Sequence, residues 1–266
     1  MMNKDRKVFF KVIIPAYNVE EYIEHCILSI EEQSFKDFEI VVVDDMSSDN
    51  TRGVLRELKN KYQNLFVVKL SEKKYNGGAR NVGINFDING EYTLFVDADD
   101  WLDNEYVLEH IHDKIVSSGF PDCVSLSYSC LIGDNKSYVP LVRDSVEDLV
   151  SSLYVACWTK CVKSDKVVRF PENTLMEDVA QHIRQCDNVD SVVSINDSCI
   201  VWNRNNINSC SRVENQDTQN GKWQSSMYRY CADLMDMKCR KQCCEEHRKW
   251  RLSVVLENIK NGVYIQ

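Results

Sequence analysis

Residues 91–100 read EYTLFVDADD, a largely apolar run that ends abruptly in acidic residues. Residues 38–45, FEIVVVDD, repeat this design with an acidic pair at the end. Continuous apolar runs of this length are typical of strands that are covered on both faces in a parallel sheet. Both runs therefore place carboxylates at the carboxyl ends of strands, which is the edge where ligands bind to open α/β sheets.

Strand-like and helix-like patterns alternate on both sides of these two runs. This alternation predicts right-handed βαβ units and an α/β fold with a mainly parallel sheet flanked by helices. After about residue 135 the pattern changes, and a helical C-terminal extension is expected. The expected strands are 8–14, 38–43, 65–70, 91–96, 122–128, 191–195 and 198–202; the expected later helices are 144–154, 175–186 and much of 215–266.

The overall composition is that of a globular protein. The 266 residues are 44% apolar and 27% charged, and 32 basic against 41 acidic residues leave a net charge of −9, which argues against a protein that coats nucleic acid. No apolar run approaches the ~18–20 residues needed to span a bilayer. Twelve cysteines without a signal-like start favour reduced thiols. We therefore expect a soluble, cytoplasmic protein.

Three carboxylates within four residues, Asp97, Asp99 and Asp100, repel one another unless a positive group lies between them. Mg²⁺ or Mn²⁺ would meet that need, because both ions take oxygen ligands and bridge to phosphates. The alternative is that Asp99 or Asp100 caps a helix beginning near Asn104. A cap explains one carboxylate and leaves two unexplained, so a divalent cation site is favoured.

Residues 76–81, NGGARN, join a flexible backbone to a cation near a helix start. Backbone N–H groups and the Arg80 guanidinium there are suited to a diphosphate, although a glycine turn with a surface arginine is the alternative. Asp44 and Asp45, the acidic pair that ends residues 38–45, could accept hydrogen bonds from a base or a ribose. A turn or cap role explains this pair about as well.

Residues 174–178, TLMED, fit a capping box with Thr174 as N-cap and Glu177 at the third helical position. The box accounts for Glu177 and leaves Asp178 unexplained. We therefore expect Asp178 to act as a general base if the first turn of this helix faces the sheet edge.

Cys239, Cys243 and His247 fall on one face of an expected helix and could form a zinc site with a neighbouring cysteine. The paired short spacings of structural zinc sites are absent, so buried thiols are the favoured interpretation. Residues 238–241, KCRK, make the tail locally basic. A solvated helix face is favoured there over a surface that docks anionic lipid.

Nine short motifs follow one another along the chain: VIIPAYN (12–18), VDDMSSDNT (43–51), GARNVG (78–83), FVDADDW (95–101), WTK (158–160), FPEN (170–173), MEDV (176–179), VWNR (201–204) and NSCS (208–211). In this order they resemble the inverting nucleotide-sugar glycosyltransferases of family 2, over about residues 8–212. The resemblance implies the GT-A fold, with a glycosyltransferase domain at 1–214 and the helical extension at 215–266. Within the domain, residues 8–130 would bind the nucleotide and residues 131–214 the acceptor.

The resemblance also implies roles for single residues. Asp99 would ligate Mn²⁺ or Mg²⁺, Asp97 would face the ribose or the water shell of the metal, and Asp178 would be the catalytic base. Met46 departs from the family pattern, which usually has glycine there, and residues 74–78 are shorter than in many members. The residues expected to contact the nucleotide sugar are Pro15, Tyr17, Asn18, Asp45 (at the base), Arg80 (near the base or diphosphate), Asp97 and Arg204 (near the diphosphate).

The implied reaction moves a sugar from a nucleotide-diphosphate sugar, with UDP favoured, to a hydroxyl of a glycan, lipid-linked or other acceptor, with inversion. Polysaccharide biosynthesis is the expected process, and residues 132–142 and the tail after Asn215 are the expected acceptor loops. A peripheral contact of the C-terminal helices with the inner face of the membrane is a further expectation. The alternative function is a noncatalytic descendant that binds nucleotide or glycan. A dinucleotide-dependent oxidoreductase is disfavoured, because PAYN follows the first strand in place of G-x-G-x-x-G.

Overall fold

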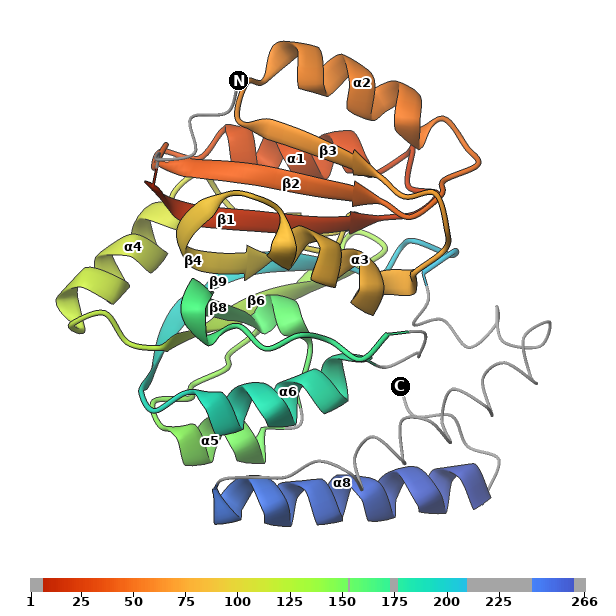
Figure 1. Cartoon of the computed structure of the whole chain (residues 1–266). Helices are drawn as coiled ribbons and strands as arrows, with labels where there is room; N and C mark the ends of the chain where they lie inside the picture. Colours follow the sequence, from red (N-terminus) through yellow and green to blue (C-terminus); the bar gives the residue numbers. More distant parts are fainter. Residues whose placement is uncertain (1–6, 153, 173–176, 210–240, 261–266) are drawn as a thin grey trace.

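The computed structural model describes residues 7–152, 154–172, 177–209 and 241–260. One continuous sheet forms its centre, and helices lie on both faces of the sheet (Figure 1). The elements, in chain order, are β1 (Lys7–Ala16), α1 (Ile23–Glu31), β2 (Phe38–Asp44), α2 (Thr51–Lys61), β3 (Leu65–Lys69), α3 (Tyr75–Asn85), β4 (Asn89–Phe95), β5 (Trp101–Leu102), α4 (Val107–Ser117), β6 (Cys123–Ile132), β7 (Asn135–Val139), α5 (Val146–Ser151), η1 (Cys157–Thr159), β8 (Lys160–Lys163), η2 (Ser164–Lys166), α6 (Glu177–Asn188), β9 (Val192–Asn203) and α8 (Gln242–Lys260).

The strand order is β3-β2-β1-β4-β8-β6-β9-β5, with β7 paired to β6. Strands β1 to β4 are parallel, β8 lies antiparallel between β4 and β6, and β9 is parallel to β6. The α/β class is thus confirmed, but the sheet is mixed instead of mainly parallel. Because β8 runs against both neighbours, its start lies at the same edge as the carboxyl ends of β4, β6 and β9.

Successive residues of β1 face two different cores, as expected of a central strand. Val12 and Ile14 are buried in the core beneath α1, α2 and α4, whereas Ile13 packs with Phe170 on the opposite face. Helix α3 covers that second face. Its close approach requires glycine at position 83, since a Cβ there would lie 2.4 Å from Cγ2 of Ile13.

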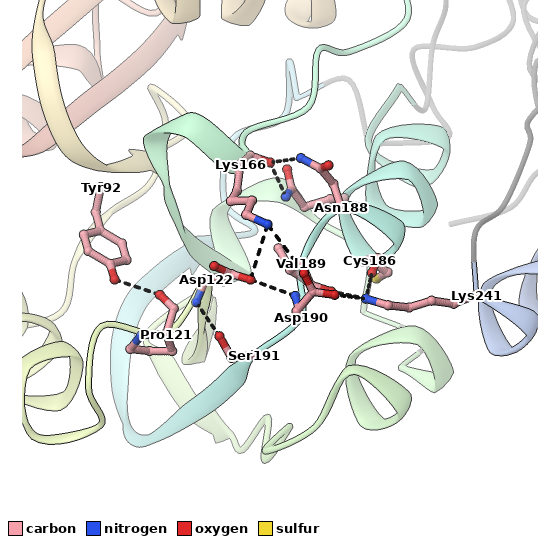
Figure 2. A network of polar contacts seen from close by, with 11 residues as sticks. Tyr92, Pro121, Asp122, Lys166, Cys186, Asn188, Val189, Asp190, Ser191 and Lys241 are labelled. Atoms are coloured by element: carbon pink, nitrogen blue, oxygen red, sulfur yellow. Dashed lines mark hydrogen bonds and ion pairs between the residues drawn. The ribbon is translucent and has the colours of Figure 1, made fainter.

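Helix α8 is joined to the end of α6 by a polar network (Figure 2). The Lys241 ammonium donates hydrogen bonds to the carbonyls of Cys186 and Val189 and lies 3.4 Å from a carboxylate oxygen of Asp190. One turn further on, Cys244 is fully buried in a core that α8 shares with α5 and α6. The other labelled members of the network are Lys166, Asp122, Asn188, Ser191, Pro121 and Tyr92.

Several elements differ from the sequence-based expectation. The expected helix at 144–154 is limited to α5, and part of the expected loop at 132–142 is strand β7, which pairs with β6. The two strands expected at 191–195 and 198–202 are one strand, β9, whose pairing with β6 is interrupted by a bulge. Asn196 and Asp197 lie within this irregularity, and their turn-like character suggested a break.

Some expectations concern residues that the structure does not describe. Thr174, Cys239 and most of the tail after residue 209 lie outside the described residues, and the division at residue 214 stays a prediction. Among the helices that the structure describes, none is both long and apolar enough to cross a bilayer.

Candidate active site

The acidic turn after β4 is tied to the end of β9. Asp99 accepts a hydrogen bond of 2.8 Å from the Asn206 amide, and Asp100 accepts one of 2.8 Å from the backbone N–H of Asn203. The alternative, in which Asp99 or Asp100 caps a helix, is not found: α4 begins at Val107, and neither carboxylate is bonded to its first turn. The backbone turns again after Asp100 to form β5, which leaves the carboxylates at the sheet edge.

The two carboxylates differ from Asp97 in their electrostatic surroundings. Asp97 forms an ion pair of 2.6 Å with Arg80, whereas no cation among the described residues pairs with Asp99 or Asp100. Burial, and then the neighbouring charge of Asp97, raises the pKa of Asp99 to about 6. Burial likewise raises the pKa of Asp100 well above its ordinary value. Negative charge at this turn therefore lacks full compensation from the surrounding side chains.

Arg80 lies at the centre of a buried ionic cluster. Its guanidinium bonds Asp97 at 2.6 Å through Nη2 and Glu177 at 2.5 Å through Nη1, and its side chain is only 2% exposed. Arg80 belongs to α3, Asp97 to the turn after β4, and Glu177 to the first turn of α6. Arg80 was expected near the base or diphosphate, but the structure has both terminal nitrogens engaged by carboxylates. Sequence reasoning missed the Glu177 contact, since a capping role accounted for that residue.

Glu177 and Asp178 are adjacent but differently accessible. Glu177 is buried against Arg80, while Asp178 is half-buried. Burial and the neighbouring Asp178 raise the pKa of Glu177 to about 7, with Arg80 acting in the opposite direction. Burial also raises the pKa of Asp178, and again Arg80 opposes the shift. Asp178 thus combines a raised pKa with a partly open side chain, two properties of a general base.

The ends of β1 and β2 form the other side of the candidate site. Asp45 is buried; its Oδ1 accepts a 2.7 Å hydrogen bond from the backbone N–H of Lys74, and its Oδ2 lies 3.3 Å from the Lys73 ammonium. The same ammonium lies over the ring of Tyr17, which is 45% exposed. Pro15, two residues earlier on β1, is buried. An aromatic face, a carboxylate and a cation therefore meet at the edge where a nucleotide is expected.

Two residues in this region have left-handed backbones. Asn18 has φ 52°, and its side-chain oxygen accepts a 2.8 Å hydrogen bond from the N–H of Ser48. Met46 has φ 65°, a conformation that favours glycine and costs roughly 1–2 kcal/mol for other residues. Although methionine stands at position 46, where the family pattern usually has glycine, the backbone there keeps the left-handed conformation that glycine favours.

Arg204 lies at the end of β9, next to the residues that hold the acidic turn. Its guanidinium lies 4.6 Å from the centroid of the Trp202 ring, and its backbone N–H donates to the carbonyl of Leu131. The structure thus brings Arg204 to the same sheet edge as the Asp97–Asp100 turn.

The donor atoms at this edge fit a divalent cation that is shared with a substrate. In the parts of the chain that are described, no three His, Cys, Asp or Glu side chains are arranged to hold a metal ion, so no closed acidic site is found there, and the zinc candidate with Cys239 lies partly outside them. Mg²⁺ and Mn²⁺ at phosphate-binding sites need only one or two protein carboxylates, the other ligands being phosphate and water. Asp99, half-buried and without a cationic partner among the described residues, has the right chemistry for that role.

Comparisons with known proteins agree with this geometry. Residues 11–136 match the sequence model described as Glycosyl transferase family 2. The chain is 32% identical to glycosyltransferase GlyA of Streptococcus pneumoniae over 188 residues, which are 63% of this chain and 26% of GlyA. It is 40% identical to poly(ribitol-phosphate) β-N-acetylglucosaminyltransferase TarS of Staphylococcus aureus over 120 residues, 40% of this chain and 20% of TarS. The chain thus spans about a quarter or less of the length of these relatives.

Solved structures show the same fold. The crystal structure of S. aureus TarS residues 1–349 with UDP-GlcNAc has a TM-score of 0.73 at 24% identity, over 93% of this chain and 71% of that one. The mannosyltransferase PcManGT of Pyrobaculum calidifontis, in complex with GDP-Man and Mn²⁺, has a TM-score of 0.65 at 17% identity, over 97% and 76% of the chains. These matches show that residues 11–136 are similar to glycosyl transferase family 2 and that the chain has the GT-A fold.

Proposed function

We propose that this chain transfers a sugar from a UDP-sugar to a hydroxyl group of a glycan, lipid-linked or other acceptor, with inversion at the anomeric carbon. The observation that carries the proposal is the Arg80 cluster. One buried guanidinium binds Asp97 from the acidic turn and Glu177 from α6, so the partly open Asp178 is held beside the edge that carries Asp99.

Pro15, Tyr17, Asn18 and Asp45 would hold the nucleotide. The exposed ring of Tyr17 offers a stacking surface, and the buried Asp45 carboxylate offers hydrogen-bond acceptors to a base. The structure of TarS with UDP-GlcNAc, a protein with the same fold, supports a UDP-sugar as the donor. Arg204, and backbone N–H groups near the start of α3, would lie toward the diphosphate.

Asp99 would hold Mn²⁺ or Mg²⁺, with Asp97 nearby, and the bound ion would neutralise charge that develops on the departing diphosphate. The structure of PcManGT with Mn²⁺ supports this choice of metal. Arg80 is assigned a positioning role, because both of its terminal nitrogens are already bonded to carboxylates. By fixing Asp97 and Glu177 it would set the separation of the acidic turn and the first turn of α6.

Asp178 would take the proton from the acceptor hydroxyl. The acceptor oxygen then forms a bond to the anomeric carbon, while the bond from that carbon to the diphosphate oxygen breaks and its electron pair leaves with the nucleoside diphosphate. Attack from the face opposite the leaving group inverts the anomeric carbon in one step. Asp178 suits this role better than Glu177, since the Glu177 side chain is buried in its pair with Arg80.

The second candidate is a noncatalytic descendant that binds nucleotide or glycan. The carboxylates that catalysis would need, Asp97, Asp99 and Asp178, are all present at one sheet edge, which favours the enzyme.

A donor panel on the full chain tests the proposal. Thermal stabilisation and donor hydrolysis would be measured with UDP-, GDP-, dTDP- and CMP-sugars, each with Mn²⁺, Mg²⁺ or EDTA. We expect stabilisation by UDP-sugars that depends on the metal, is lost in Asp99→Asn and is kept in Asp178→Asn. Turnover in Asp178→Asn should fall by about 10²–10⁴-fold. No turnover with any donor, together with intact nucleotide binding, would favour the noncatalytic alternative.

A further inference from the structure

Four aromatic side chains gather beside the acidic turn, and we call them the aromatic shelf: Tyr128, Tyr154, Trp158 and Trp202. The Tyr128 ring lies at their centre, with centroid distances of 5.9 Å to Tyr154, 5.0 Å to Trp158 and 6.2 Å to Trp202. Tyr128 and Trp158 are buried, Trp202 is half-buried and Tyr154 is 47% exposed. The shelf therefore has a buried base and an open aromatic surface.

The fold places the shelf next to the candidate site. Trp158 lies in η1, directly before β8, and Trp202 lies near the end of β9; both positions belong to the edge where β4 ends. The residue after Trp202, Asn203, bonds Asp100. The residue before Trp158, Cys157, packs near the ionic cluster: burial raises the pKa of its thiol, Arg80 opposes the shift, and Asp178 adds to it.

Two buried cations fix the backbone of the segment that carries Tyr154 and Trp158. The Arg143 guanidinium donates to the carbonyl of Tyr154 at 3.2 Å, to that of Thr159 at 3.5 Å, and to the hydroxyl of Ser125 at 2.7 Å. Lys160 donates from Nζ to the carbonyls of Val155, at 3.0 Å, and Ala156, at 2.9 Å.

Neither Arg143 nor Lys160 is paired with a carboxylate within the described residues, and both side chains are almost fully buried. Burial lowers the pKa of Arg143 to about 10 and that of Lys160 to about 8. Burying a cation without a counter-charge is costly. A surface segment held in this way presents its aromatic side chains at fixed positions.

We infer that the aromatic shelf is the acceptor subsite, and that it binds a pyranose ring of the acceptor against the open face of Tyr154 and the half-open Trp202. Aromatic faces bury the apolar C–H face of a sugar while the hydroxyl groups at the ring edge stay free to bond polar groups. This inference rests on the proposed function, because it places the acceptor on the side of the acidic turn away from the nucleotide residues.

Binding of simple sugars to the full chain tests the inference. The probes are the p-nitrophenyl β-pyranosides of glucose, galactose, N-acetylglucosamine and glucuronic acid, titrated calorimetrically in the presence of UDP and MnCl₂. Tyr154→Leu keeps an apolar contact with Tyr128 and removes the aromatic face. Tyr154→Phe keeps that face. Tyr106→Ala is the matched control, since Tyr106 is 48% exposed and also stacks on a neighbouring ring, that of His110.

We expect at least one pyranoside to bind, and Tyr154→Leu to raise its Kd about tenfold. Tyr154→Phe and Tyr106→Ala should bind it as the unaltered chain does, and UDP should stabilise all three variants equally. The inference is overturned if no pyranoside binds, or if Tyr154→Leu binds as tightly as the unaltered chain. Failure of the proposed function would be seen separately, as an absence of turnover in the donor panel or of metal-dependent stabilisation by UDP before any pyranoside is added.

Discussion

Replacing Arg80 by methionine should destabilise the protein through the carboxylates that it leaves behind. In the structure, one guanidinium that is 2% exposed compensates Glu177, 7% exposed, and Asp97, 28% exposed. Removing one partner of a buried ion pair costs about 3–5 kcal/mol, because the other charge stays buried and unpaired. Asp97 is open enough to be hydrated, so most of the loss should come from Glu177. For a chain of this size the loss corresponds to a decrease in Tm of about 10 °C.

The size of this loss should depend on pH. The pKa of Glu177 is raised from 4.5 to about 7 even with Arg80 in place, and it should be higher in Arg80→Met. A carboxyl group whose pKa is raised by folding stabilises the fold fully below its unfolded pKa, and this stabilisation is lost as the pH rises through the folded pKa. The deficit of Arg80→Met relative to the unaltered chain should therefore be smallest near pH 5 and grow toward pH 8.

A double-mutant cycle measured by urea unfolding at pH 5 and pH 8 checks this account. Glu177→Gln removes the charge that Arg80→Met would strand, so the double variant should be about 2 kcal/mol more stable at pH 8 than Arg80→Met alone. Arg80→Lys keeps the positive charge but cannot bridge both carboxylates. Its stability should therefore lie between those of the unaltered chain and Arg80→Met. The reasoning is refuted if Arg80→Met costs less than about 1 kcal/mol, or if Glu177→Gln makes it no more stable.

Three further predictions follow from single features. Because burial raises the pKa of Asp178, kcat/KM for sugar transfer should fall with acidification through a limb above the ordinary aspartate pKa of 3.8; a pH–rate profile that is flat down to pH 4 would contradict the base assignment. Gly83→Ala should destabilise by about 1–3 kcal/mol, despite the higher helix propensity of alanine, because the new Cβ would meet Ile13; urea unfolding measures this, and a gain in stability would show that the contact relaxes freely. Lys241→Met should speed amide hydrogen exchange in α8 while Lys249→Met, a change at an exposed side chain, should not; equal exchange in the two variants would mean that the Lys241 bonds do not hold the helix.

The parallel half of the fold was predictable because its strands carry the signal locally. Residues 40–43 and 94–96 are apolar throughout, as is typical of buried parallel strands, and acidic residues follow each of them. The second half was predicted less well because its order depends on pairing partners. Strand β7 is a polar, exposed segment that is a strand only through its bonds to β6, and the bulge in β9 has the composition of a turn. Antiparallel β8, four residues long, gave no pattern that the sequence alone could resolve.

The candidate site was predictable only where a residue's role follows from its neighbours in the chain. The Asp97–Asp100 turn could be placed at the sheet edge because a strand precedes it directly. The Arg80–Glu177 contact joins residues 97 positions apart, and no spacing rule links them. The same is true of Arg143 and Lys160, whose partners are backbone carbonyls that carry no mark in the sequence.

Helix α6 connects the candidate active site to the contact with α8. Its first turn carries Glu177 and Asp178, and its last turn accepts the Lys241 bonds that hold α8. A twelve-residue helix is a stiff rod of roughly 18 Å. The seat of α8 and the position of Asp178 are therefore set by the two ends of one rigid helix.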